Sequence, residues 1–217
     1  MRQVNITSAC DAVKLIRSGM TVMVGGFMAV GTPEKVIDAL VASPVGKLTV
    51  ICNDAGLPDK GVGKLIAAGK VKKLYASHIG LNRIAGEKMT AREMEVELIP
   101  QGTLAEQIRA GGAGLGGVLT KTGVGTLVQE GKQTVVVNGE TFLLEAPLKA
   151  DVSLLKASRS DVFGNLAYDK TTKNFNIVMA TAASKVVAEV DEVLETEDFL
   201  VETALTPSIL VDHVVRA

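Results

Sequence analysis

The stretch from Met20 to Pro33 joins an apolar run to a helix start through a glycine loop. Residues 20–24 are apolar and rich in β-branched side chains, which is typical of a buried strand. A glycine pair at 25–26 ends that run, and Thr32 and Pro33 suit the cap and the first position of a helix. The sequence therefore predicts a strand, a glycine loop and a helix N-terminus in succession. Such a loop lets a phosphate or a thioester-bearing arm approach backbone N–H groups.

The spacing of the glycines argues against a dinucleotide fingerprint. That fingerprint requires Gly-x-Gly-x-x-Gly, whereas here Gly25-Gly26 is followed by four residues and then Gly31. Asp54, at the end of the next predicted strand, fits the dinucleotide pattern only superficially. Glycines at a strand-to-helix turn also occur without any ligand, so spacing alone leaves a ligand loop and a plain turn both open.

Apolar periodicity along the chain predicts an α/β fold. A second buried strand at 48–52 completes a β-α-β unit, which implies a right-handed crossover and parallel strands. Further strands are expected at 71–77, 96–99, 151–157, 186–190 and 210–215, and helices at 8–18, 33–41, 61–68, 103–110 and 178–184. We therefore expect an open, mostly parallel sheet flanked by helices, with a β-hairpin insertion, in a single domain spanning residues 1–217.

Two turn-rich segments interrupt this pattern. Asn138-Gly139 lies between the β-prone runs 134–137 and 141–144 and predicts a two-residue hairpin that decorates the parallel sheet. Residues 111–117 hold five glycines in seven positions and end the preceding helix. They can form a flexible linker, or a packed loop that approaches a ligand or a partner backbone. The apolar residues in and beside the run, such as Leu115, favour the packed loop.

Composition excludes several classes of function. Lys and Arg number 23 against 24 Asp and Glu, and only 3% of the residues are aromatic, so no basic face or stacking platform for nucleic acid is expected. Two cysteines provide no disulfide framework, and both Cys10 and Cys52 are expected to be small core residues. No apolar run approaches the ~18 residues of a membrane span, so we expect no membrane association and a cytoplasmic protein.

Polar side chains that follow predicted strands are the candidates for chemistry. Gln101 comes just past the strand at 96–99, and its amide N–H₂ can donate to a developing oxyanion. Asn53 follows the strand at 48–52, where a turn role and a substrate contact are equally open. His78 ends the strand at 71–77, although a lone histidine is more often structural. No Cys/His cluster has metal-ligand spacing, since His78 and His213 are far apart, so no metal is expected.

The glycine stretch Val-Gly-Gly-Phe-Met-Ala-Val-Gly-Thr-Pro at 24–33 resembles the glycine-loop signature of class I coenzyme A transferases, in their small A (alpha) subunit. Six further blocks follow in the order of that family, at 53–54, 76–80, 100–114, 122–126, 161–165 and 173–176. The blocks are most similar to the A subunits of acetate/acetoacetate and butyrate–acetoacetate CoA-transferases. The resemblance implies the open sheet of the CoA-transferase and ribose-phosphate-isomerase type.

The resemblance also implies a ping-pong reaction through an enzyme glutamyl-CoA thioester. In the family, the nucleophilic glutamate belongs to a Ser-Glu-Asn-Gly motif on the B subunit, and this sequence contains no such motif. Glu106 and Glu145 lie in segments expected near the site, but neither has that context, and Glu106 is more simply a surface or ion-pair residue. The chain is therefore expected to be active only with a B subunit, in a hetero-oligomer with A–A and A–B contacts.

The family's functional residues map onto two blocks of this chain. The loop Gly25, Gly26, Phe27, Met28, Ala29, Val30 and Gly31 matches the CoA-associated loop, and Gln101 matches a Pro-Gln-Gly-Thr block near the reacting carboxylate. Asn53 is a weaker substrate candidate. Coenzyme A would be a substrate, with no permanently bound cofactor. A side chain at Gly26 is expected to fill the space that CoA needs while the chain still folds.

Two alternatives compete with the transferase hypothesis. A sugar-phosphate isomerase or sensor would share the general fold, but it needs a complete acid and base set in this one chain. A dinucleotide-binding module is disfavoured by the glycine spacing. Within the transferase hypothesis, acetate, acetoacetate and butyrate remain open as acids, because one methylene changes binding by only ~1–3 kcal/mol.

Overall fold

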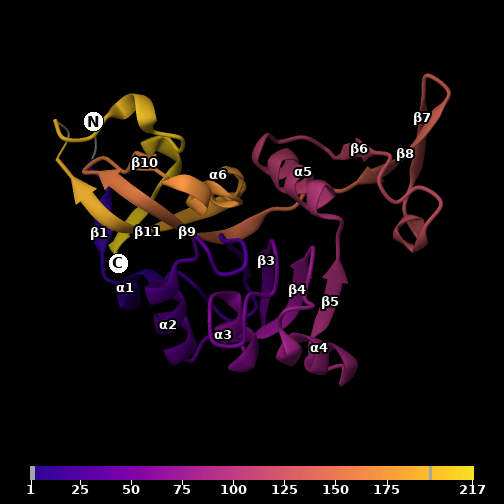
Figure 1. Ribbon diagram of the computed structural model, residues 1–217, viewed down its shortest axis with the longest axis horizontal. Helices are drawn as coiled ribbons and strands as arrows, with labels where there is room; N and C mark the ends of the chain where they lie inside the picture. The colour runs from indigo at the N-terminus through magenta and orange to yellow at the C-terminus, as the bar shows by residue number, and fades with distance from the viewer. Residues whose placement is uncertain (1–2, 196) are drawn as a thin grey trace.

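The computed structural model of the protein describes residues 3–195 and 197–217. One large sheet runs through the body of the molecule (Figure 1). Its strands are β1 (Asn5–Thr7), β2 (Thr21–Val24), β3 (Leu48–Cys52), β4 (Val71–Ala76), β5 (Glu95–Leu98), β9 (Ala150–Asp161), β10 (Leu166–Ala167), β11 (Ala183–Leu194) and β12 (His213–Arg216). Their order is β1-β12-β11-β9-β2-β3-β4-β5, and every neighbouring pair in that order is parallel. β10 alone is antiparallel, beside β9. The predicted fold class is therefore confirmed.

Helices cover both faces of this sheet (Figure 1). On one face lie α1 (Ala9–Val13), α2 (Glu34–Ala42), α3 (Val62–Ala67) and α4 (Arg83–Thr90), and on the other lie α5 (Gln101–Gly112) and α6 (Asn176–Met179). Alternate side chains of a strand point to opposite faces, so each strand contributes to two cores. In β2, Val22 and Val24 are buried with α2, whereas Met23 is buried with α5 and α6. Short 3₁₀ turns occupy Leu127–Gln129, Lys170–Lys173, Val201–Thr203 and Ser208–Leu210.

A second, antiparallel sheet projects from the body (Figure 1). It consists of β6 (Val118–Thr120), β7 (Thr134–Val137) and β8 (Glu140–Glu145), with β8 in the middle. Asn138 and Gly139, between β7 and β8, both have positive φ, which confirms the two-residue hairpin. The sequence predicted that this hairpin decorates the parallel sheet, but the structure places it in the separate antiparallel sheet. It pairs with β6 instead, a strand too short to be recognised by its periodicity.

The carboxyl ends of β2, β3, β4 and β5 meet at one edge of the large sheet. Val24 pairs with Cys52, and Ala76 pairs with Leu98, so these strands end nearly level with one another. β2 also marks the point where the chain changes direction across the sheet, because β3 lies on one side of it and β9 on the other. In open parallel sheets, ligands bind outside the carboxyl ends of the strands at such a switch point.

Helix α5 is longer than the sequence predicted at both ends. It begins at Gln101 because the Pro100 carbonyl already accepts a hydrogen bond from the Leu104 N–H at 2.9 Å. It continues through Gly111 and Gly112, and these two glycines allow close packing. A Cβ on Gly111 would lie 1.9 Å from the Leu148 carbonyl oxygen. The packed interpretation of the glycine run therefore holds for its first two residues and for Gly117, whose Cβ would lie 2.8 Å from the Glu145 carbonyl oxygen, whereas Gly114 and Gly116 face open space.

Three other predicted boundaries are wrong for local reasons. The helix expected at 8–18 ends at Val13, and the chain continues in tighter turns in which the Ile16 N–H bonds to the Val13 carbonyl. The helix expected at 178–184 is instead α6, because Ala182 already pairs with the start of β9. The last strand begins at His213 and not at residue 210, since a 3₁₀ turn precedes it.

The expectation that both cysteines belong to the core is wrong for Cys10. Cys52 in β3 is buried, and burial raises the pKa of its thiol well above the usual range. Cys10 is exposed. It lies two positions before Ala12, so it is rotated by about 200° from that buried residue around the axis of α1. In the part of the chain that the structure describes, no helix is long and apolar enough to cross a membrane.

Candidate active site

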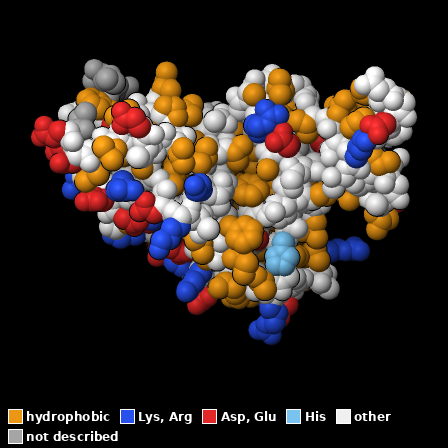
Figure 2. All heavy atoms as spheres, turned by 45° about the horizontal axis from the view of Figure 1, so that its top comes forward, with side chains coloured by type: hydrophobic (Ala, Val, Ile, Leu, Met, Phe, Trp, Pro, Cys, Tyr) orange, Lys and Arg blue, Asp and Glu red, His pale blue; other side chains and the backbone are white. Residues whose placement is uncertain are grey.

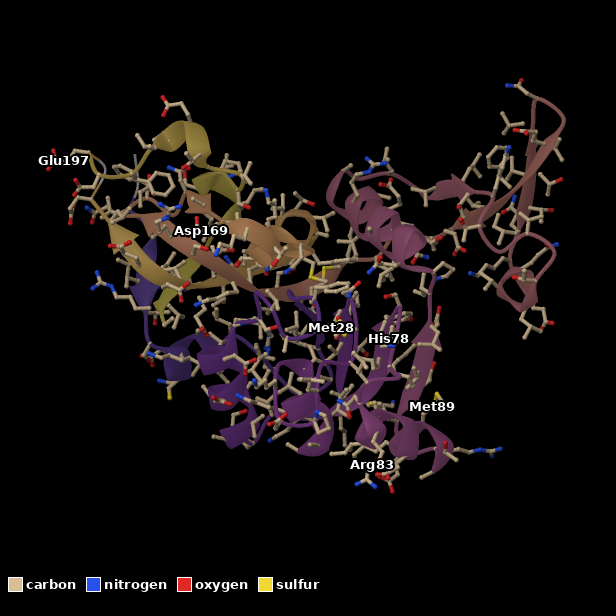
Figure 3. The ribbon with its side chains drawn as sticks, in the orientation of Figure 1. Met28, His78, Arg83, Met89, Asp169 and Glu197 are labelled. Atoms are coloured by element: carbon tan, nitrogen blue, oxygen red, sulfur yellow. The ribbon has the colours of Figure 1, made fainter. Side chains whose placement is uncertain are left out.

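The fold brings four sequence-predicted segments to the edge where β2, β3, β4 and β5 end. The glycine loop Gly25–Gly31 follows β2, Asn53-Asp54 follows β3, His78 follows β4, and Gln101 follows β5 as the first residue of α5. Figure 3 shows the labelled Met28 and His78 at this edge, below α5. Gln101 was expected in a loop and is instead the first residue of a helix, but the edge of the sheet is the predicted one.

A chain of side-chain hydrogen bonds connects Gln101 to the glycine loop. The Gln101 Nε2 donates to Asn53 Oδ1 at 2.7 Å, and the Asn53 Nδ2 donates to Asp54 Oδ2 at 2.8 Å. The same Asp54 oxygen accepts the backbone N–H of Met28 at 2.8 Å. Asn53 and Asp54 are buried, so these bonds are shielded from competing water. We refer to Gln101, Asn53 and Asp54 as the polar relay.

The tip of the glycine loop is a two-residue turn built without glycine. Phe27 and Val30 exchange both backbone hydrogen bonds, at 3.0 and 2.8 Å, and Met28 and Ala29 between them have φ of 47° and 63°. Positive φ costs a residue with a Cβ roughly 1–2 kcal/mol. Strain of this kind persists only where surrounding contacts over-determine the backbone, and the bond from Met28 to Asp54 is one such contact.

The three glycines of the loop are required by protein contacts. A Cβ on Gly25 would lie 1.7 Å from Asn176 Oδ1, and one on Gly31 would lie 2.9 Å from the Thr172 carbonyl oxygen. Gly26 has φ of 127°, and its Cβ would lie 2.4 Å from Thr32 Oγ1. The expectation that a Gly26 side chain would fill ligand space while the chain still folds stays a prediction, and the first atom that such a side chain meets is Thr32 Oγ1. That side chain would collide with the protein itself.

A ligand must therefore approach the loop from its outer side. The hollow beneath the loop, bounded in part by Gly26, Thr32 and Asp54, measures about 10 Å³, which is room for about one water molecule. On the outside, Phe27, Met28 and Val30 keep 43–48% of their surface exposed. Figure 2 shows hydrophobic side chains gathered beside a histidine in the middle of this face. The loop thus offers an apolar tip and a polar, hydrogen-bonded base.

His78 contributes to this edge through its backbone. Its carbonyl accepts the Ala55 N–H at 3.1 Å and so continues the pairing of β3 and β4 beyond their last residues. Its ring is exposed near Gly80. The contact that His78 makes within the sheet is thus a backbone contact, which does not depend on its ring.

The two glutamates noted in the sequence are both held in ion pairs. Glu145 is buried, where it pairs with Lys132 at 2.7 Å and accepts a hydrogen bond from Gln107 at 3.2 Å. Glu106 pairs with Arg109 at 2.8 Å on the exposed surface of α5, as predicted. Neither belongs to the polar relay. Within residues 3–195 and 197–217, no group of three or more His, Cys, Asp or Glu is placed to hold a metal ion.

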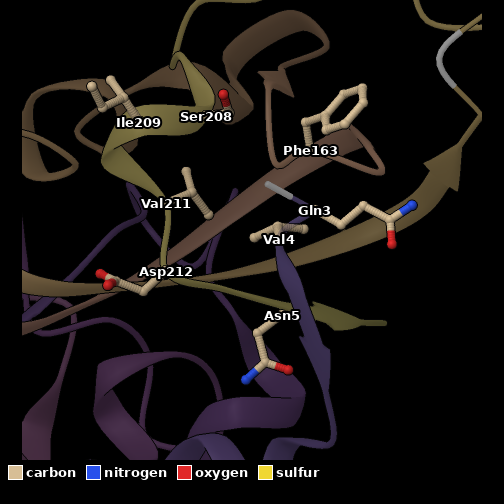
Figure 4. Close-up of a pocket in the computed structure, with 8 residues that line it drawn as sticks. All are labelled: Gln3, Val4, Asn5, Phe163, Ser208, Ile209, Val211 and Asp212. Carbon is tan, nitrogen blue, oxygen red and sulfur yellow. The ribbon is translucent and has the colours of Figure 1, made fainter. Parts of the chain in front are cut away.

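A hollow of about 330 Å³ lies beside β1, the strand at one edge of the large sheet (Figure 4). Asn5, Phe163 and Asp212 are among the residues that line it. Three strands, β12, β11 and β9, separate β1 from β2 and its glycine loop. This hollow is therefore distinct from the edge that carries the predicted residues.

Comparison with known proteins agrees with this geometry. A family profile described as "Coenzyme A transferase" matches residues 6–217. The chain is 51% identical to the acetate CoA-transferase subunit alpha of Escherichia coli K12, over 94% of this chain and 93% of that one. It is 52% identical to the acetoacetyl-CoA:acetate/butyrate CoA transferase alpha subunit of Clostridium acetobutylicum, over 92% of each chain. The chain belongs to the coenzyme A transferase family.

A solved structure extends the comparison to the fold. An acyl-CoA transferase of Escherichia coli O157:H7, determined as a thioester complex with CoA, superposes with a TM-score of 0.89 at 22% identity. The match covers 99% of this chain and 47% of that longer one, so this transferase subunit spans about half of its length. The resemblance inferred from the seven sequence blocks, and the open sheet that it implied, are both confirmed.

Sequence reasoning missed the residues that hold the transferase loop in shape. Asp54 was considered only as part of a dinucleotide pattern and of the block at 53–54, yet it anchors the tip of the loop through Met28. Asn174 and Asn176 were noted only as part of a block at 173–176, and both bond to the loop backbone. Residue type offered one signal, since buried amides and carboxylates at turns usually bond to backbone. The sequence does not indicate which backbone groups they bond to, because those groups lie about 145 residues earlier in the chain.

Proposed function

We propose that this chain is the A subunit of an enzyme that moves CoA between a short-chain acyl-CoA or 3-oxoacyl-CoA and a carboxylic acid of the acetate, acetoacetate and butyrate class. The names of the two relatives above 50% identity support this substrate class. The observation that carries the proposal is the polar relay, because it joins Gln101 to the glycine loop in one site. Both halves of that site match family blocks that were identified separately in the sequence.

The reaction needs a carboxylate nucleophile, which we assign to a glutamate of a B subunit. That carboxylate attacks the thioester carbonyl of the donor and expels CoA thiolate, leaving a mixed anhydride. The thiolate then attacks the glutamyl carbonyl of the anhydride, which releases the donor acid and leaves a glutamyl-CoA thioester. An acceptor carboxylate reverses both steps and leaves as acyl-CoA. Coenzyme A is thus a substrate and not a resident cofactor.

In this scheme, the A subunit binds and polarises groups that the B subunit attacks. The amide nitrogen of Gln101 carries two N–H groups, and Asn53 receives one of them. The second can donate to the oxyanion that forms at each carbonyl. Asn53 holds the Gln101 amide in orientation, and the outer surface of residues 25–31 receives the CoA arm. The ion pairs of Glu106 and Glu145 support the assignment of the nucleophile to the B subunit.

The proposal is tested by measuring CoA transfer from acetoacetyl-CoA to acetate, first with this chain alone and then with a B subunit. Activity only in the mixture is the expected result. Activity from this chain alone would refute the shared site and would make Glu106 and Glu145 the first candidates for the nucleophile. If neither preparation is active with acetate or butyrate as acceptor, the assigned substrate class is wrong.

The sugar-phosphate alternative finds little support in the site. It would need an acid and a base in this chain that are available to a substrate. The carboxylate of the relay, Asp54, is buried and already accepts hydrogen bonds from the Met28 N–H, the Gly56 N–H and the Asn53 amide. An aldose–ketose isomerase assay on pentose and hexose phosphates is expected to show no turnover.

A further inference from the structure

We propose that Asn174 and Asn176 are positioning residues that fix the glycine loop in the shape that receives the CoA thioester. The inference rests on the proposed function, because it assigns a task to the same loop. Asn174 directly follows the 3₁₀ turn Lys170–Lys173, and Asn176 is the first residue of α6, so both are far from the loop in sequence. We refer to the pair as the asparagine clasp.

Asn174 spans the neck of the loop with a single side-chain amide. Its Oδ1 accepts the Gly26 N–H at 3.2 Å, and its Nδ2 donates to the Val30 carbonyl at 3.0 Å. Gly26 precedes, and Val30 belongs to, the Phe27–Val30 pair that closes the turn at Met28 and Ala29. One planar group therefore sets the separation and the relative orientation of the two backbone strands that carry the exposed tip.

Asn176 attaches the end of the loop to the central strand β9. Its side chain is fully buried, its Oδ1 accepts the Lys156 N–H at 3.0 Å, and its Nδ2 donates to the Gly31 carbonyl at 2.9 Å. A Cβ on Gly25 would lie 1.7 Å from that Oδ1, so Gly25 and Asn176 fit only as a pair. The loop end therefore has one position relative to β9.

The clasp and Asp54 hold the loop from opposite directions. Asp54, beyond β3, holds the tip at Met28, and the clasp, between β10 and β11, holds the neck. Without the clasp, the strained backbone of Met28 and Ala29 would depend on the bond to Asp54 and on the pairing of Phe27 with Val30. A loop that must be ordered when the thioester binds spends part of its binding free energy on that ordering. The clasp removes this cost in advance, so its loss should weaken binding of the thioester more than that of the small acid.

The test compares Asn174→Ala with Asn165→Ala in the complex with a B subunit. Asn165 is a matched control, because it is also half-buried and its amide also joins two segments, through Asp161 Oδ2 at 2.7 Å and the Ser208 N–H at 2.9 Å. We expect Asn174→Ala to raise the KM for acetoacetyl-CoA about tenfold and to change the KM for acetate less than twofold. Asn165→Ala is expected to lower Tm comparably and to leave both KM values unchanged.

A second readout reports on the clasp without relying on activity. Backbone hydrogen exchange of a peptide covering residues 25–32 is expected to accelerate in Asn174→Ala and not in Asn165→Ala. If the wild-type complex is active and Asn174→Ala keeps both KM values, the positioning role is wrong while the proposed function stands. If the wild-type complex is inactive, the function is wrong and the exchange rate alone decides whether the clasp shapes the loop.

Asn174→Asp addresses the case in which the alanine variant does not fold. It keeps the volume and an acceptor for the Gly26 N–H, but it replaces the donor to the Val30 carbonyl with a second oxygen. We expect a raised KM for acetoacetyl-CoA and faster exchange here too. Wild-type values for both would overturn the proposal.

Discussion

Two turns of this chain have nearly the same backbone and opposite origins. In the projecting sheet, Asn138 and Gly139 have φ of 52° and 79°, and these residue types adopt such angles at little cost. In the glycine loop, Met28 and Ala29 have φ of 47° and 63°, although neither residue type favours the left-handed region. The first turn is specified by its own two residues. The second is specified by Asp54 and the asparagine clasp, which come from distant parts of the chain.

The difference separates a structural turn from a functional one. A turn that its own residues specify needs no support, so the hairpin can stand on a projecting sheet with solvent around it. A strained turn requires a rigid frame, and strain of this kind is concentrated at active sites and ligand clamps. Two consecutive strained residues at 28–29 therefore fit the function proposed for this loop.

The largest effect is expected at Gln101, which is connected to the strained turn through Asn53 and Asp54. Gln101→Ala should lower kcat by roughly 10²–10³, because an oxyanion donor is lost. The measurement is steady-state transfer from acetoacetyl-CoA to acetate with a B subunit present. Gln129→Ala is the control in the region of the projecting sheet, where it likewise removes one hydrogen bond, to the Gly125 N–H, and should keep kcat. An unchanged kcat in Gln101→Ala would reduce Gln101 to a scaffold residue.

The second prediction concerns the neck of the glycine loop. Gly26→Val should lower the free energy of unfolding by about 1–3 kcal/mol, because its side chain meets Thr32 and its φ of 127° is unsuited to a β-branched residue. Urea unfolding followed by circular dichroism measures the effect. Wild-type stability combined with a complete loss of transfer would contradict it, and would support the idea that this position faces ligand.

A smaller effect is expected from adding a Cβ to the hairpin turn. Gly139→Ala should destabilise the chain by about 1 kcal/mol through backbone strain alone, since a Cβ there has no atom within 4 Å. The same unfolding measurement applies. A loss well above this value would show that the hairpin depends on contacts elsewhere, and the contrast between the two turns would then fail.

The smallest effect is the reverse substitution in the strained turn. Ala29→Gly should raise stability by less than about 1 kcal/mol, because relief of left-handed strain slightly exceeds the added entropy of the unfolded chain. A decrease in stability would mean that Ala29 is not strained as its φ of 63° indicates. Comparing the changes in unfolding free energy of Ala29→Gly and Gly139→Ala shows whether the two turns, which have similar φ values, carry different strain.

The sequence predicted those parts of the fold that are set by neighbouring residues. The strand Leu48–Cys52 and the Asn138-Gly139 hairpin were placed correctly, because periodicity and turn chemistry act over a few positions. The edge of the sheet that carries Gln101 and Asn53 also followed from parallel strand order. Their hydrogen bond did not, because it depends on how β4 and β5 align beside β3.

The remaining errors share one cause, which is contact between distant segments. Cys10 is exposed because α1 buries its other side, and a five-residue helix shows too little periodicity to reveal that. Helix α5 includes Gly111, and the missing Cβ there leaves room for the carbonyl of Leu148. In each case the deciding atom lies far along the chain, where no local pattern indicates it.

The asparagine clasp also determines when the loop acquires its shape as the chain is made. Gly26 and Asn174 are separated by 148 positions, so a ribosome has already released most of β2 to β9 before the clasp residues emerge. Domains generally fold as units, and contacts over such distances close late. The loop is thus finished only when the chain is nearly complete. Chains terminated before Asn174 would contain the loop sequence but lack the clasp that shapes it, so they would compete poorly for acyl-CoA.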